Sequence, residues 1–251
     1  MKLEQQISNW LKDYLNSCSL NCFVVGVSGG IDSALVSTLC AQTNCKTFLL
    51  SLPINQANDQ LERARNHIEW LKCNYSNVTS MEIDLTETFN VFKSLFTLKD
   101  NLALANSKSR LRMTSLYHVA STYRGLVVGT GNKIEDFGVG FFTKYGDGGV
   151  DISPIADLTK TQVKLLAKEL KISDDIINAK PTDGLWEDNR SDEEQLGASY
   201  EELEWAMSNL NIPVLDLTER QLEVIKIYKN YNLKNQHKIN PIPVFKLKDN
   251  A

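Results

Sequence analysis

The chain has 251 residues, of which 42% are hydrophobic and 23% are charged, and its formal net charge is −4. These values fit an ordinary globular protein and argue against a disordered chain, a fibre or a generally basic nucleic-acid-binding protein. Residues 3–15 place apolar side chains at helical spacing among charged ones, which predicts an amphipathic helix rather than a signal peptide or membrane span. We therefore expect a cytoplasmic protein that binds neither nucleic acid nor membrane.

Four short segments rich in branched and aromatic residues follow in chain order, and each is typical of a buried parallel strand. They are residues 22–27, 46–53, 78–85 and 125–130. Segments of helical periodicity separate them, at 33–42, 58–72, 86–96 and 101–123. Because strands that alternate with helices form parallel sheets through right-handed crossovers, we predict an α/β fold: a doubly wound parallel sheet of about five strands flanked by helices.

The part of the chain after residue 150 is predicted to be mainly helical. Residues 158–170, 199–209 and 217–231 have helical periodicity, and a tail follows from residue 237. The acidic, glycine-containing stretch 181–197 is too polar for a core, so we interpret it as a linker or a cover over a site. We treat residues 1–251 as a single domain with a helical C-terminal part.

The exit of the first strand carries the strongest feature of the sequence, the run VVGVSGGIDSALVSTL at 24–39. Gly29 and Gly30 let an anion approach the backbone amides that open the following helix. Ser28 and Ser33 add hydroxyl donors, and Asp32 offers a carboxylate to a magnesium ion that bridges phosphates. The alternative is a plain tight turn in which Asp32 caps the helix. The run matches neither the Walker loop nor the G-x-G-x-x-G fingerprint of dehydrogenases.

The pattern S-G-G-x-D-S at 28–33 resembles the signature of the ATP pyrophosphatase group, which has an adenine-nucleotide alpha-hydrolase-like fold. Within that group, GFFTKYGDGG at 140–149 resembles the ammonia-dependent NAD synthetase family, as do SRLRM at 109–113 and KPT at 180–182. The resemblance covers most of the chain in the same order. It implies a carbon–nitrogen ligase that amidates nicotinate adenine dinucleotide (deamido-NAD) with ammonia and ATP, through an acyl-adenylate, to give NAD, AMP and pyrophosphate.

The resemblance also implies the residues of the site. ATP would be held by Gly26, Val27, Ser28, Gly29, Gly30, Ile31, Asp32, Ser33, Thr130, Lys160 and Thr182. The acid substrate would be bound by Arg110, Lys144, Asp151, His237 and Lys238, since spaced cations suit a polyanion and a carboxylate suits a ribose. A Mg²⁺ ion would be shared by Asp32 and Glu135. Catalysis would involve Asp32 and Lys160. Apart from the resemblance, ammonium must lose a proton near the acyl carbon, and Asp147 is our candidate for the acidic residue that accepts it.

Each of these assignments has a simpler alternative. For Lys160 the alternative is a solvated lysine at the start of a helix, and for Glu135 it is a residue that caps a helix. Asp147 is otherwise a turn residue between glycines, and His237 with Lys238 part of a mobile polar tail. 

One departure from the family pattern concerns spacing. The interval from Glu135 to Lys144 is one residue longer than in the family form, which leaves Asp136 open as the metal ligand instead of Glu135. Arg63 and Arg65, after the second predicted strand, are candidates for the nucleotide neighbourhood, although a solvated helical face is the simpler interpretation.

Rival functions remain at this stage. The same chemistry on nicotinate mononucleotide would use the same ATP motifs, and another amide-forming ligase of the group is a further alternative. A tRNA-thiolating enzyme is disfavoured, because it would call for paired cysteines and a basic surface, and the sequence indicates neither. A non-catalytic nucleotide-binding module is disfavoured because Asp32, Glu135 and Lys160 occur together.

The resemblance further implies partners. The length leaves no room for a glutaminase domain, so free ammonia or an amidase partner would supply the nitrogen. Members of the family form homodimers, and the 3–15 helix could contribute to such a contact.

Overall fold

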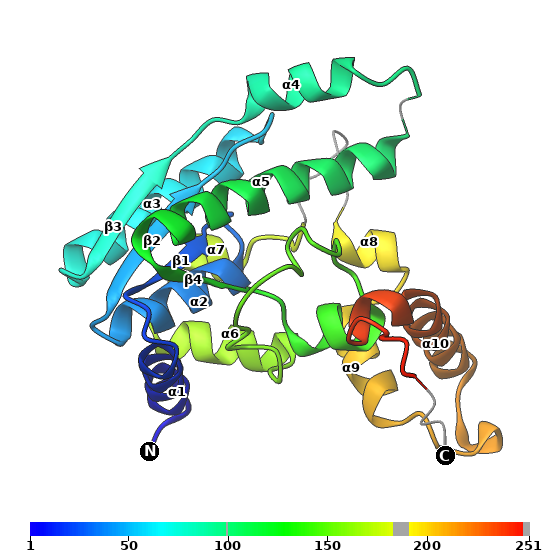
Figure 1. Cartoon of the computed structure of the whole chain (residues 1–251). Coiled ribbons are helices and arrows are strands. Elements are labelled where there is room, and N and C mark those ends of the chain that lie inside the picture. The colour runs from blue at the N-terminus through cyan, green and yellow to red at the C-terminus, as the bar shows by residue number, and fades with distance from the viewer. Residues whose placement is uncertain (99, 183–190, 248–251) are drawn as a thin grey trace.

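The computed structural model describes residues 1–98, 100–182 and 191–247, and it contains a parallel β-sheet with helices packed above and below it (Figure 1). The strands are β1 (Cys22–Gly26), β2 (Lys46–Ser51), β3 (Val78–Glu82) and β4 (Gly125–Val128), in the order β3-β2-β1-β4. The predicted α/β fold is confirmed, with four strands in the described residues instead of about five. An isolated parallel bridge from Val128 to Ile152 adds one residue pair beyond the named strands.

Helices cover both faces of the sheet and form a hydrophobic core on each. Successive side chains of β1 point to opposite faces, so they belong to alternate cores. Phe23 and Val25 belong to the first core and Cys22 and Val24 to the second. The first core is closed by α1 (Leu3–Ser17), α2 (Ile31–Gln42), α3 (Asn58–Asn74), α6 (Lys160–Glu169) and α7 (Asp174–Ile177). The second is closed by α5 (Asn101–Tyr123), with α4 (Thr86–Ser94) beside it.

The N-terminal helix α1 has the amphipathic character that its sequence predicts. Ile7, Leu11 and Leu15 pack into the first core, whereas Trp10 and Tyr14 remain exposed on the outer side. Among the described residues, no helix combines the length and the apolar character that a bilayer crossing requires.

The third strand is less buried than its sequence suggested. Every residue of β3 is at least partly accessible, whereas in β2 every residue after the exposed Lys46 is buried. β3 pairs only with β2 and forms an edge of the described sheet. Val78 packs against the first core and Met81 against the second, and both stay partly accessible.

The C-terminal part forms a third, smaller core around the π-helix η1 (Lys133–Val139). It is built by α8 (Asp192–Leu196), α9 (Tyr200–Ser208) and α10 (Glu219–Ile239), with a 3-10 turn η2 (Val214–Asp216) between the last two. Helix α10 continues past the predicted end at 231 and includes His237 and Lys238. The two residues are thus part of a helix, and the polar-tail alternative does not hold for them.

The chain order places a topological switch point between β1 and β4. From β1 the chain proceeds outwards to β2 and β3, and it then returns through α5 to β4 on the other side of β1. In open parallel sheets, ligands bind beyond the carboxyl ends of the strands at such a point. The two strand exits singled out in the sequence, after β1 and after β4, meet there.

Candidate functional site

A cavity of about 650 Å³ opens at the carboxyl ends of β1 and β4. The two strand exits, α3, α5 and segments of the C-terminal part form its wall, and the volume is in the range of nucleotide-sized ligands. Every residue predicted to hold ATP or metal lines this cavity, together with Asp147 and Lys238. These are Gly26, Val27, Ser28, Gly29, Gly30, Ile31, Asp32, Ser33, Thr130, Glu135, Lys160 and Thr182.

The turn between β1 and α2 depends on a glycine at one position. Gly29 has a φ of +86°, and a Cβ added there would lie 2.3 Å from the backbone oxygen of Gln60 in α3. Gly30 has a φ of −92°, and the atom nearest to an added Cβ is the Oγ of Ser28 at 3.4 Å. Of the two glycines, Gly29 is therefore the one that the backbone geometry requires.

The two serines of the turn are hydrogen-bonded to each other and to its backbone. Their Oγ atoms lie 3.1 Å apart, and Ser33 Oγ donates to the carbonyl of Gly30 at 3.0 Å. Ser28 Oγ accepts from the amide of Gly30 at 3.2 Å. The turn thus gathers two hydroxyls and a backbone amide at the start of α2, where the helix dipole favours an anion.

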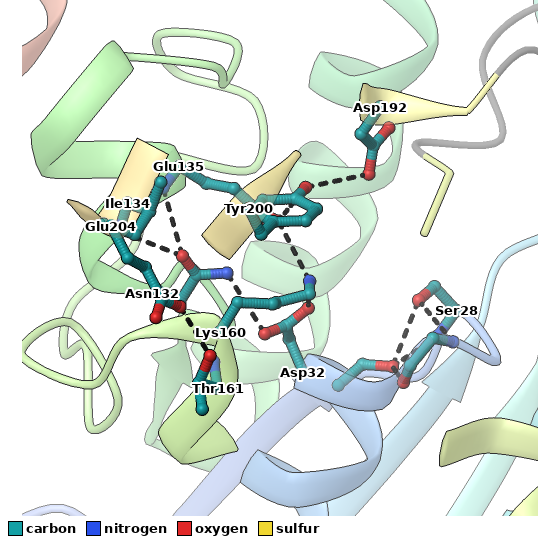
Figure 2. A network of polar contacts seen from close by, with 12 residues as sticks. Ser28, Asp32, Asn132, Ile134, Glu135, Lys160, Thr161, Asp192, Tyr200 and Glu204 are labelled. Atoms are coloured by element: carbon teal, nitrogen blue, oxygen red, sulfur yellow. Dashed lines mark hydrogen bonds and ion pairs between the residues drawn. The ribbon is translucent and has the colours of Figure 1, made fainter. Parts of the chain in front are cut away.

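Asp32 faces the cavity and does not cap α2. The N-cap is Gly30, and no side chain accepts a capping hydrogen bond there. The Asp32 carboxylate instead accepts from Lys160 Nζ at 2.5 Å and from Asn132 Nδ2 at 3.2 Å (Figure 2). The cap alternative for Asp32 is therefore wrong.

Lys160 lies between two carboxylates that come from distant parts of the chain (Figure 2). Its Nζ is 2.5 Å from Asp32 Oδ2 and 2.9 Å from Glu135 Oε1, and its side chain is 4% exposed. Burial opposes the charge on Lys160, but the two carboxylates outweigh burial and raise its pKa. Lys160 is thus a buried ammonium ion at the start of α6, and the solvated-lysine alternative does not hold.

The two acids of this group respond differently to burial. Burial raises the pKa of Asp32, and the charge of Lys160 only partly offsets it. At Glu135 burial also opposes the charge, but Lys160 and the hydroxyl of Tyr200 outweigh it and lower the pKa. Glu135 is therefore the more firmly ionised of the pair.

Glu135 and Asp136 lie in the π-helix η1, before Lys144. A π-helix closes i→i+5 hydrogen bonds, as from the amide of Gly140 to the carbonyl of Glu135, so it accommodates one residue more than an α-helical turn. Glu135 is the residue that contacts Lys160, whereas Asp136 folds back so closely on Gly131 that an added Cβ there would lie 1.9 Å from its Oδ2. The structure thus brings Glu135, and not Asp136, towards Asp32.

Asp136 nevertheless borders the same cavity. Burial, followed by the charges of Asp147, Glu135 and Asp32, raises the pKa of Asp136 well above its ordinary value. The π-helix therefore presents two successive carboxylates to the cavity, of which the first is ion-paired.

Asn132 is a functional residue that sequence reasoning missed. It is fully buried, its Oδ1 accepts from the amides of Ile134 and Glu135, and its Nδ2 donates to Asp32. One side chain thus fixes the start of η1 relative to the start of α2. Its position in the GTGNK run at 129–133 was the available signal.

Tyr200 and Asp192 were also missed, because each lies more than fifty residues from Glu135. The Tyr200 hydroxyl is 2.5 Å from Glu135 Oε1 and 3.3 Å from Asp192 Oδ2 (Figure 2). Only the packing of α8 and α9 on η1 brings them to the site.

The site fits a magnesium ion that is held largely by nucleotide phosphates. The described residues contain no group of three or more His, Cys, Asp or Glu side chains arranged for a metal. They do bring Asp32 and Glu135 together around a cation, the Nζ of Lys160. Because Mg²⁺ is usually bound through one or two carboxylates plus substrate phosphates and water, this pair is sufficient for a metal that arrives with ATP.

The sequence left open whether Asp147 stabilises a turn or faces the site, and the structure shows that it does both. Its Oδ1 accepts from Ser109 Oγ at 2.6 Å and from the amide of Thr143 at 3.0 Å, so it does organise the glycine-rich turn. Its carboxylate also borders the cavity, although the surrounding protein raises its pKa by burial. Lys238 is among its charged neighbours and donates to the carbonyl of Phe142 at 2.7 Å.

Only some of the residues predicted to bind the acid substrate lie in contact with one another, and fewer of them line the cavity. Arg110, Lys144 and His237 lie in contact, since Arg110 Nε donates to the Lys144 carbonyl and Lys144 Nζ to the His237 carbonyl. The Asp151 carboxylate accepts a hydrogen bond from the amide of Val127 at 2.8 Å and another from the hydroxyl of Tyr117 at 2.9 Å. Of the five predicted residues, Lys238 is the one that lines the cavity.

The two arginines of α3 differ in position. Arg63 lines the cavity, and its Nε lies 3.4 Å from the carbonyl of Gly29. Arg65 forms an exposed ion pair with Glu82 of β3 at 2.5 Å. The solvated-face interpretation is thus correct for Arg65, whereas Arg63 lines the cavity beside the phosphate turn.

Comparison with known proteins relates the whole chain to one family. The family model for NAD synthase matches residues 3–242. An NH(3)-dependent NAD(+) synthetase of Malacoplasma penetrans is 41% identical over 83% of this chain and 83% of that protein, and one of Finegoldia magna is 36% identical over 88% and 90%. The solved structure of an NMN synthetase from Francisella tularensis superposes with a TM-score of 0.85 at 29% identity, and the match covers 99% of this chain and 98% of that one.

Proposed function

This chain belongs to the NAD synthase family, and we propose that it is a ligase that forms NAD from nicotinate adenine dinucleotide, ammonia and ATP. The observation that supports this most directly is the cavity at the switch point, where the Ser28–Ser33 turn meets Lys160, Asp32 and Glu135. Such a site binds a polyphosphate through backbone amides and the lysine ammonium. It also offers two carboxylates to a metal ion that accompanies the polyphosphate.

In the first half reaction, an oxygen of the nicotinate carboxylate attacks the α-phosphorus of ATP, and pyrophosphate leaves. Charge that builds on the phosphate oxygens is stabilised by the amides of the turn and by the Lys160 ammonium. Mg²⁺, carried by Asp32 and Glu135, supplies further neutralisation of the phosphates when it is bound. Lys160 then exchanges at least part of its carboxylate contacts for phosphate contacts.

In the second half reaction, ammonia attacks the acyl carbon, and AMP leaves. Ammonium must first lose a proton, and we assign the role of acceptor to the Asp147 carboxylate, which lines the cavity. Ser109 and the Thr143 amide bind one oxygen of Asp147 and so fix the orientation of the acid.

The acid substrate is bound at the outer side of this site. Arg110 and Lys144, which adjoin each other beside the end of α10, supply cations for its phosphates. Lys238 is placed to contact the same molecule from inside the cavity.

A second substrate is supported by one observation. The Francisella tularensis protein that superposes over nearly the whole chain is an NMN synthetase. Nicotinate mononucleotide carries the same carboxylate in a shorter molecule, so the ATP half of the site serves either acid.

One experiment separates these alternatives. The purified protein is incubated with ATP, MgCl₂ and an ammonium salt, and with either nicotinate adenine dinucleotide or nicotinate mononucleotide. We expect AMP and pyrophosphate in equal amounts, with a higher kcat/KM for the dinucleotide. A preference for the mononucleotide would assign the second function, and ADP formation or a lack of turnover with both acids would contradict the proposal.

We also propose that the protein is a homodimer. Helix α4 and the segment that follows it expose a group of large apolar side chains that is unusual for a monomer, namely Val91, Phe92, Leu95, Phe96 and Leu98. This surface is more extensively apolar than the exposed side of α1, where Trp10 and Tyr14 lie. Light scattering should give twice the chain mass, and Leu95→Glu should give the monomer mass; a monomeric wild-type protein would contradict the proposal.

A further inference from the structure

The hydroxyl of Tyr200 is the contact that links the C-terminal helices to the ionic group of the site. It lies 2.5 Å from Glu135 Oε1, the same oxygen that Lys160 Nζ approaches at 2.9 Å (Figure 2). The Lys160 ammonium also lies 4.8 Å from the centre of the Tyr200 ring. The tyrosine is therefore in contact with both charged partners and is 1% exposed.

The position of this hydroxyl is fixed by several independent contacts. Tyr200 is the first residue of α9, and Ser199 before it forms a reciprocal capping pair with Glu202. The amide of Tyr200 donates to Glu193 of α8 at 2.9 Å. Its ring packs with Ile134 and Leu203 in the third core. A side chain held in this way has little freedom to follow Glu135 if that residue moves.

The hydroxyl donates to Glu135 and not to Asp192. A phenol has one proton, and the distance to Glu135 is 2.5 Å against 3.3 Å to Asp192 Oδ2. A phenol has an ordinary pKa of about 10, so the Tyr200 hydroxyl carries its proton at neutral pH and acts as a donor. The bond to Glu135 is thus one from a neutral donor to an ionised acceptor, which is among the stronger types.

The geometry points to Tyr200 as the positioning residue of Glu135: it keeps the carboxylate aimed at the position beside Asp32 when Lys160 turns to the phosphates of ATP. This inference rests on the proposed function, since it takes Glu135 to be a ligand of the magnesium that accompanies ATP. Glu135 has three rotatable side-chain bonds and sits on a π-helix, and the two donors described here bind one oxygen, Oε1. Once Lys160 leaves, the tyrosine hydroxyl still fixes the orientation.

The test removes one oxygen and leaves the ring in place. Tyr200→Phe keeps the packing in the third core and the contact of the ring with Lys160, but it cannot donate to Glu135. The matched control is Tyr228→Phe, because Tyr228 is 4% exposed in the same core and, within the part of the chain that the structure describes, its hydroxyl makes no hydrogen bond. Circular dichroism and Tm of both variants verify that each is folded.

Two measurements address metal binding. Mn²⁺ is titrated into each protein in the presence of an ATP analogue with a methylene bridge between the α- and β-phosphates, and free Mn²⁺ is measured by electron paramagnetic resonance. We expect Tyr200→Phe to weaken Mn²⁺ binding about tenfold and Tyr228→Phe to change it less than about twofold. In turnover, the Mg²⁺ concentration for half-maximal AMP formation should rise by a similar factor, with the rate at saturating Mg²⁺ largely retained.

The outcomes are distinguishable. Equal Mn²⁺ affinities for the two variants would overturn the inference and leave Tyr200 with a packing role only. A lower kcat for Tyr200→Phe at all Mg²⁺ concentrations, without a change in metal affinity, would also contradict it. If the wild-type protein forms no AMP with either acid, the proposed function fails, and the Mn²⁺ titration still decides the role of Tyr200.

Discussion

Gly29 and Gly30 are adjacent in the phosphate turn, and the structure predicts opposite results for the same substitution at each. Gly29→Ala forces an L-residue into a φ of +86°, which costs about 1–2 kcal/mol. Its Cβ would lie 2.3 Å from the Gln60 backbone oxygen, whereas real Cβ contacts are hardly ever under 3.0 Å. The turn and α3 must therefore separate by at least about 0.7 Å, the difference between these two distances. At Gly30 the backbone is ordinary, and the nearest atom, 3.4 Å away, belongs to a serine hydroxyl.

The displacement acts on ATP binding and on the rate. A misplacement of about 1 Å in a catalytic site lowers rates by about 100-fold, so we expect kcat/KM for ATP of Gly29→Ala to fall by about that factor. The strain should lower stability by about 2 kcal/mol, which for a chain of this size corresponds to a fall in Tm of about 4–8 °C. Gly30→Ala should remain within about threefold of the wild-type kcat/KM.

The assay is AMP formation at varied ATP, with calorimetric ATP binding and a thermal melt on both variants. The comparison is internal, because both variants add the same methyl group to the same turn. If Gly29→Ala and Gly30→Ala bind ATP equally well, the packing of α3 on the turn does not set the shape of the phosphate site, and the reasoning is refuted.

Three further predictions concern charged groups. Lys160→Met leaves Asp32 and Glu135 without their ammonium partner and should destabilise the protein by about 3–5 kcal/mol; MgCl₂ should raise the Tm of this variant more than that of the wild type, and an equal rise in both would count against the pairing. Asp147→Asn should lower kcat/KM for ammonium about 100-fold and leave KM for ATP within about twofold, and an unchanged ammonium dependence would remove Asp147 from the mechanism. His67 is buried against Ser37, and burial lowers its pKa from 6.5 to about 4. Since the unfolded chain then binds the additional proton first, the stability due to neutral His67 is fully present above about pH 6.5 and is lost towards about pH 4. Urea titrations at about pH 7.5 and about pH 5 should therefore show a loss of about 2 kcal/mol that His67→Gln lacks, and an equal loss in that variant would contradict the assignment.

The elements with a local signal were predicted closely. Helix α5 spans the predicted residues 101–123, and the four strands begin at the predicted residues. Periodicity is a property of short segments, so it can be recognised without knowledge of the fold. The ends of the elements were less accurate, as in α10, which continues to Ile239 because its last turns pack on η1 and the cavity wall.

The site was predictable where its chemistry is encoded in one contiguous run. The turn at residues 28–33 places glycines, hydroxyls and Asp32 at fixed spacing, and the structure gathers all of them at the cavity. The π-helix η1 was not predictable from the sequence, because its hydrogen-bond pattern depends on Asn132 and on contacts with α10.

The sequence by itself determined the α/β class and the phosphate turn, since periodicity, residue type and local spacing mark both. Lys160 and Glu135 entered as candidate site residues through the resemblance to a known family, and Asp147 as an acidic residue near the same motif. The tertiary structure decided which charges meet: it placed Lys160 between Asp32 and Glu135, chose Glu135 over Asp136, and brought Tyr200 to the same oxygen. These contacts join residues 25 to 128 positions apart. Such partners are selected by the packing of α6, α8 and α9 against the sheet and η1, and no local pattern in the chain records that packing.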